Sequence, residues 1–169
     1  RNILIFFFFL LLIAPAVLYG QGRRIDPLKA GAQVHGTGWT ELRRGYVRLP
    51  EQARSQVREA LWNLSRNSSG LSLVFRSNTG RLVVKCVLED RMQMFHMPAT
   101  GVSGVDLFAC DTRGTEHWCA PKFRPSFTQG SGTEVIYNYE RLDYEHQTDI
   151  YTYRLYLPLY NSVSSLELT

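Results

Sequence analysis

Alternation of apolar and polar residues from Leu71 onward is the feature that most limits what this chain can fold into. The apolar members of four such runs are Leu71, Leu73 and Phe75; Leu82, Val84, Cys86 and Leu88; Val135, Tyr137 and Tyr139; and Tyr151, Tyr153, Leu155 and Leu157. A period of two places the apolar side chains of each run on one face of a strand. Turn-forming segments at 67–70, 77–80, 112–114 and 129–132 lie beside these runs. The sequence therefore predicts an all-β domain, a β-sandwich of the jelly-roll type.

The segment 51–64 follows a different period. Behind Pro50, apolar residues recur at helical spacing: Ala53, Val57, Ala60, Leu61 and Leu64. This spacing predicts one short helix over 51–64, with an irregular connection as the alternative. Ahead of it, 45–50 is expected to be a short strand ended by proline, and the polar, glycine-bearing segment 23–38 a tether.

The N-terminal segment has the composition of a leader. Residues 3–13 are all apolar, Arg1 precedes them, and small residues lead to Gly22. Such a run is too short for a bilayer, which needs about 20 residues. We therefore expect 1–22 to be a signal peptide, N-terminally incomplete, and the protein to be secreted, periplasmic or at the cell surface. No stable membrane span is then expected after cleavage; an uncleaved anchor is the alternative.

Residues 39–169 are long enough for one domain with a core of its own. Because the alternation still runs at Thr169, we expect the protein to continue beyond this chain. A formal net charge of +4 with 44% hydrophobic residues is typical of a globular protein. No basic run could neutralise a phosphate track, so nucleic acid is not an expected partner.

A hairpin tip at residues 112–113 predicts how two strands pair. Leu107 would then face Trp118 and share the apolar face with it, while Asp106 would face Cys119 on the other side. In this register Cys110 and Cys119 are four residues apart along the strands, about 13 Å. That separation is too long for a disulfide.

The same residues do not predict a metal centre or a cofactor. Cys110, His117 and Cys119 would lie on one face, but structural zinc sites use two close ligand pairs, and only one is present. Cys86 falls on the apolar side of its strand and is expected to be a small buried hydrophobe.

No catalytic residue is predicted either. The segment 101–104, with Ser103, is one residue short of a nucleophile elbow and precedes a strand. Of the four histidines, only His146 has the aspartate-x-x-histidine spacing of an SGNH hydrolase, with Asp143, and no glycine-aspartate-serine nucleophile block accompanies it. Ser103 and His96 could meet in space, but the sequence offers no third partner for a triad.

One segment carries a strong resemblance to a known family. Residues 96–108, HMPATGVSGVDLF, resemble the glycine-x-aspartate-leucine-tyrosine motif of a small all-β domain. That domain lies N-terminal to the catalytic domain in some secreted SGNH (GDSL-type) hydrolases. Segments 45–50, 61–71, 74–78 and 155–161 also look like parts of this domain. Phe108 stands where the motif has tyrosine, which removes a hydroxyl.

This resemblance implies a non-catalytic accessory domain whose partner is a C-terminal SGNH catalytic domain. The whole protein would be an esterase that acts on acylated carbohydrate. The residues that the resemblance marks as motif or domain interface are His96, Met97, Pro98, Gly104, Asp106, Leu107 and Phe108.

Asp106 is expected to accept hydrogen bonds from backbone amides of its own glycine-rich loop. In the alternative, its sheet face docks the catalytic domain, with residues 96–98 beside the active-site mouth.

The competing functional class is a stand-alone carbohydrate-binding module. Aromatic side chains can stack on sugar rings, and tyrosines gather toward the C-terminus at Tyr137, Tyr139, Tyr144, Tyr151, Tyr153, Tyr156 and Tyr160. Core and interface packing is the more usual role of tyrosine in strands, and we expect it here.

Overall fold

The computed structural model describes residues 22–111, 113–122, 125–128, 133–142 and 151–169. Nearly all of the expected signal peptide, the turn at 129–132 and Tyr144 lie outside these residues. No helix in the described ranges is long and apolar enough to cross a membrane.

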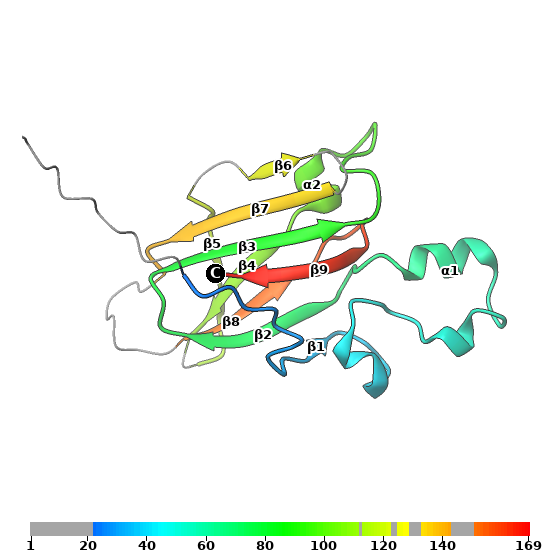
Figure 1. Cartoon of the computed structure of the whole chain (residues 1–169), viewed down its shortest axis with the longest axis horizontal. Helices are drawn as coiled ribbons and strands as arrows, with labels where there is room; N and C mark the ends of the chain where they lie inside the picture. Colours follow the sequence, from blue (N-terminus) through cyan, green and yellow to red (C-terminus); the bar gives the residue numbers. More distant parts are fainter. Residues whose placement is uncertain (1–21, 112, 123–124, 129–132, 143–150) are drawn as a thin grey trace, which may run out of the picture.

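Two antiparallel sheets stacked face to face form the body of the domain (Figure 1). In spatial order, the five-stranded sheet contains β1 (Val34–His35), β2 (Ser72–Ser77), β8 (Tyr151–Tyr156), β4 (Asp106–Cys110) and β5 (Glu116–Cys119). The four-stranded sheet contains β6 (Ser126–Thr128), β7 (Thr133–Glu140), β3 (Arg81–Leu88) and β9 (Val163–Leu168). The predicted all-β sandwich is therefore confirmed.

The core lies between the sheets and is built from the alternating residues of the sequence. Along β3 every second residue is buried, from Leu82 to Leu88. Val84 pairs with Tyr137 of β7 across the sheet. Tyr153 of β8 stacks on Phe75, with ring centroids 5.6 Å apart. Period-two patterning thus predicted which side chains fill the core.

Helical structure is sparse in the described residues and differs from the prediction. The segment 51–64 forms a 3-10 turn (Glu51–Ala53) and a separate helix α1 (Glu59–Ser65) that projects from the end of the sandwich (Figure 1). Leu61 and Leu64 are exposed, and Trp62 is buried instead. Because α1 lies outside the sheets, its apolar spacing does not mark a buried face.

Two further short helical segments occur where the sequence suggested none. Thr40–Arg44 forms a 3-10 helix, and Ala99–Ser103 forms helix α2 behind Pro98. The segment of α2 had been expected to be a turn-prone loop because it contains glycine. Pro98 is extended and immediately precedes the first helical residue, a position that suits proline's fixed φ.

The segments expected to be a tether and a first strand both differ from the prediction. Residues in 23–38 supply β1, and Ile25 makes a two-way backbone bridge to Leu168, with both N···O distances 2.8 Å. Segment 45–50 contains no strand. It is held by Arg48, whose guanidinium donates to the carbonyl oxygens of Asn67 and Leu64.

The β4–β5 hairpin pairs one residue away from the predicted register. Leu107 faces Cys119 and Phe108 faces Trp118. The cause is the turn: Asp111 N–H bonds Thr115 O at 3.0 Å, so Asp111 faces Thr115 and not Gly114. A one-residue shift moves every side chain of a strand to the opposite face.

This shift places Trp118 outside and Cys119 in the core, the reverse of the prediction. Cys110 and Cys119 therefore lie on opposite faces of the sheet, and Cys86 is fully buried in β3. All three cysteines are thiols. The prediction against a Cys110–Cys119 disulfide used a register that the structure does not have, and it is the opposite faces of the two residues that separate them.

Candidate functional site

Residues 104–108 carry the motif from α2 into β4. Leu107 is fully buried between the sheets. Gly104 has an ordinary φ of −75°, but a Cβ added to it would lie 2.1 Å from Thr100 O and 2.6 Å from Tyr137 Oη. The glycine is therefore needed for the close approach of α2 to the start of β4 and to β7. Its conformational freedom is not used here.

A tight turn ahead of α2 projects two side chains into solvent. Met94 and Met97 exchange two backbone hydrogen bonds, of 3.0 and 3.2 Å, which close the turn. Phe95 and His96 occupy its tip, with ring centroids 4.6 Å apart in an edge-on contact. Phe95 has a relative exposure of 103%. His96 is also exposed, and Pro98 follows the turn at the start of α2.

One buried side chain fixes the base of this loop. The side-chain amide of Asn161 donates to Asp90 O at 3.3 Å, Arg91 O at 3.2 Å and Ser103 Oγ at 2.9 Å. Asn161 Oδ1 accepts from Asp90 N–H at 2.9 Å. Ser103 in turn donates to Met92 O at 2.8 Å. The β8–β9 connection, α2 and the loop after β3 are thereby joined through two fully buried polar residues.

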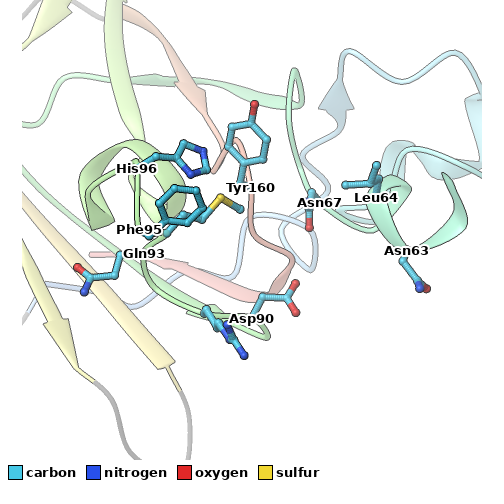
Figure 2. Close-up of a pocket in the computed structure, with 10 residues that line it drawn as sticks. Asn63, Leu64, Asn67, Asp90, Gln93, Phe95, His96 and Tyr160 are labelled. Atoms are coloured by element: carbon cyan, nitrogen blue, oxygen red, sulfur yellow. The ribbon is translucent and has the colours of Figure 1, made fainter. Parts of the chain in front are cut away.

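A groove of about 550 Å³ separates the projecting turn from α1. Figure 2 shows Phe95 and His96 on one side, Leu64 on the other, and Tyr160 between them. Its main lining residues are Asn63, Leu64, Asn67, Phe95, His96 and Tyr160.

Sequence reasoning selected His96 in this groove but missed Phe95 and Leu64. Leu64 belongs to the apolar residues at helical spacing in 51–64, yet it is 55% exposed. Phe95 lies between two strands in a segment without alternation. A large aromatic in such a segment is the signal that could have identified it.

The outer face of the five-stranded sheet holds the remaining motif residues. Phe108 packs edge-on against Tyr156, with ring centroids 5.6 Å apart. Asp106 is exposed and its Oδ1 accepts from the indole N–H of Trp118 at 3.3 Å. The expectation that Asp106 bonds amides of its own loop is therefore wrong. The segment before Asp106 is a helix and not a loop, and the observed hairpin register places Trp118 on this face.

Charged residues order the neighbouring part of this face. Arg154 Nε donates to Glu116 Oε1 at 2.5 Å, and its Nη1 donates to Ser72 Oγ at 3.3 Å. Tyr156 donates to Glu116 Oε2 at 3.4 Å. The hydrogen bond to Glu116 raises the pKa of Arg154 above its already high ordinary value. The network holds Arg154 near the ring of Tyr156, 6.0 Å from its centroid.

Comparison with known proteins shows which family these features belong to. The family model GxDLY, described as the N-terminus of SGNH-hydrolase-type esterases, matches residues 24–169. The chain belongs to the GxDLY family. No curated protein sequence matches it. The crystal structure of a protein described as a putative GDSL-like lipase from Bacteroides ovatus ATCC 8483 has a similar fold, with a TM-score of 0.67 and 21% identity. That match covers 86% of this chain but only 40% of the lipase chain.

Within the GxDLY motif, Phe108 stands where the family name has tyrosine. Its ring is half-buried on the outer face, against Tyr156. The missing hydroxyl therefore removes a polar group from the edge of the aromatic cluster without opening the core.

The residues considered for catalysis and metal binding do not come together in this GxDLY domain. Ser103 is fully buried in its hydrogen-bond network, whereas His96 is exposed on the turn. His117 Nε2 lies 3.2 Å from Asp111 Oδ2. The bond from Thr115 N–H, and then His117, hold the pKa of Asp111 below its usual value. No group of three His, Cys, Asp or Glu residues in the described ranges is placed to hold a metal ion.

Proposed function

We propose that this GxDLY domain is the non-catalytic, N-terminal accessory domain of a secreted SGNH-type esterase. Its partner is a C-terminal catalytic domain in the same polypeptide, and the substrate is an acylated carbohydrate. The observation that carries the proposal is the family match over residues 24–169, because that family describes the N-terminus of such esterases.

The surroundings of Ser103 support a non-catalytic role. A serine nucleophile needs an adjacent base and an exposed Oγ that a substrate can reach. Ser103 Oγ instead donates to one backbone carbonyl and accepts from the Asn161 amide, and it is fully buried. The ester chemistry then belongs to the partner domain.

Two preparations test this proposal. One is the present chain, and the other is the complete polypeptide with its catalytic domain. We expect the complete polypeptide to release acetate from p-nitrophenyl acetate and from acetylated xylo-oligosaccharides, and the present chain to release none. Turnover by the present chain that Ser103→Ala abolishes would contradict the non-catalytic role. Activity of the complete polypeptide on long-chain glycerides alone would contradict the substrate class.

The outer sheet face favours a second candidate function, carbohydrate binding. Phe108, Trp118 and Tyr156 lie together there beside Arg154, and Trp118 is 55% exposed. Exposed aromatic faces stack on sugar rings, and the indole is held in place by Asp106. Calorimetry of the present chain with xylohexaose and cellohexaose tests this candidate. Saturable binding that Trp118→Ala removes would support it, and no heat with either sugar would reject it.

A further inference from the structure

We propose that the turn carrying Phe95 and the groove beside it form the surface on which the catalytic domain packs, with Phe95 as the central anchor. The proposal rests on the proposed function, since it names the surface that the accessory domain offers to its partner. It assigns a docking role to a loop outside the GxD part of the motif.

Exposed apolar side chains gather at this end of the sandwich. Beside Phe95, Met94 is 37% exposed, Leu64 55% and Tyr160 42%. A second hollow of about 260 Å³ shares Leu64 and Tyr160 with the groove and adds Leu159, which is 50% exposed. The two hollows adjoin, because Leu64, Asn67 and Tyr160 line both. Exposed apolar surfaces of this kind mark places where a protein, a membrane or a ligand binds.

Hydrogen bonds within this domain fix the turn that carries Phe95. Two backbone hydrogen bonds close the turn between Met94 and Met97. Asn161 and Ser103 fix the start of the loop through buried hydrogen bonds to each other and to the carbonyl oxygens of Arg91 and Met92. A rigid aromatic side chain loses little conformational freedom on binding, and such residues dominate the binding energy of interfaces. The loop thus presents an exposed aromatic side chain on a backbone that is already ordered, as a docking contact requires.

The groove also has the polar rim of a protein interface. Asp90, Arg91, Asn63 and Asn67 line it around the apolar residues, and His96 stands beside Phe95 at the tip. A hydrophobic centre with polar groups around it is the usual anatomy of a protein–protein contact. The chemistry therefore fits a folded protein surface with an apolar pocket for the Phe95 ring.

The catalytic domain is the occupant that the comparisons favour. GxDLY domains form the N-terminus of SGNH-type esterases, and this chain covers only 40% of the lipase chain that shares its fold. More than half of that lipase chain therefore lies outside the matched domain. A domain in the same polypeptide is present at high effective concentration, so the contact needs less affinity than one between separate proteins.

Thiol labelling measures whether this surface is covered. In a Cys110→Ser background, which leaves the buried Cys86 and Cys119, His96→Cys is introduced into the present chain and into the complete polypeptide, because His96 lies beside Phe95 at the tip and its replacement keeps the Phe95 ring. Trp118→Cys is the matched control, because Trp118 is exposed on the sheet face. We expect maleimide to label the His96→Cys thiol at least about tenfold more slowly in the complete polypeptide, because the docked domain would cover this turn. The control thiol should label equally fast in both.

Equal labelling of the His96→Cys thiol in the two proteins would overturn the proposal. Protection in the present chain that increases with its concentration would also overturn it, in favour of a second copy as occupant. Hydrogen exchange of residues 89–98 in the two unsubstituted proteins gives the same comparison without substitution. The esterase assay on the same preparations tests the proposed function separately. If the complete polypeptide is an active esterase but the turn is unprotected, the docking surface is rejected and the proposed function stands.

Discussion

The side-chain amide of Asn161 lies 2.9 Å from Ser103 Oγ, and this bond joins segments 58 residues apart in the sequence. Both residues are fully buried. The same Asn161 side chain also bonds the loop that leads to the Phe95 turn. The shape of the candidate docking loop therefore depends on a residue near the end of the chain.

Asn161→Ala is expected to lower the free energy of unfolding by about 2–4 kcal/mol, because it leaves several buried polar groups without partners. Urea denaturation followed by circular dichroism measures this loss. Asn63→Ala, at an exposed position of α1, is the matched control and should change stability by less than about 0.5 kcal/mol. Equal effects of the two substitutions would show that the hydrogen bonds of the Asn161 side chain do not stabilise the domain.

Gly104→Ala is expected to destabilise the domain by about 2–3 kcal/mol, because the added Cβ overlaps Thr100 O and Tyr137 Oη. Thermal melting provides the measurement. Gly38→Ala is the control, since a Cβ at Gly38 would meet nothing within 4 Å. A melting temperature of Gly104→Ala equal to that of the control would show that α2 can move away from β7 without loss.

Asp106→Asn is expected to change the unfolding free energy by less than about 0.5 kcal/mol, because the site is exposed and the amide oxygen can still accept from Trp118. Chemical denaturation of the present chain measures it. A loss of about 1–3 kcal/mol is the result expected for a carboxylate in buried hydrogen bonds. That outcome would restore the loop-bonding role that the sequence suggested for Asp106.

The domain is expected to lose stability as the pH rises from about 9 toward 12. Burial raises the pKa of the Cys86 thiol to about 12, from an ordinary value of 9.0. It also raises the pKa of Tyr137 to about 12. The unfolded chain then releases its protons at lower pH than the folded one, so alkaline pH favours unfolding. Urea midpoints between these pH values measure the fall.

Cys86→Ala provides the control for this pH dependence. It should lower stability at neutral pH, since it leaves a cavity in the core, but its midpoint should fall less steeply above about pH 9. Identical slopes for the two proteins would show that Cys86 does not contribute to the alkaline transition.

Sequence patterning predicted the sandwich because strand alternation and core burial have the same physical cause. Residues such as Val84 and Leu155 must face inward when one side of a sheet is covered. The same logic failed for Leu61 and Leu64, whose helix projects beyond the sheets. Local spacing does not reveal whether another element covers a helix.

The candidate site was less predictable because it depends on exact turns and on distant contacts. A single extra residue in the turn after Asp111 exchanged the faces of Trp118 and Cys119. The resemblance marked His96 as a motif or interface residue, and the structure shows it exposed on the turn ahead of α2. Nothing local in the sequence connects Asn161 with Ser103, so the support beneath the loop became visible only in three dimensions.

The late position of Asn161 also sets an order of events during synthesis. At about 5–20 residues per second, a ribosome needs roughly 3–12 s to travel from Ser103 to Asn161. During that interval the segment with Phe95 has left the peptidyl-transferase centre but lacks the side chain that fixes it. The surface proposed to receive the neighbouring domain thus cannot be fixed in the described shape until Asn161 has been synthesised.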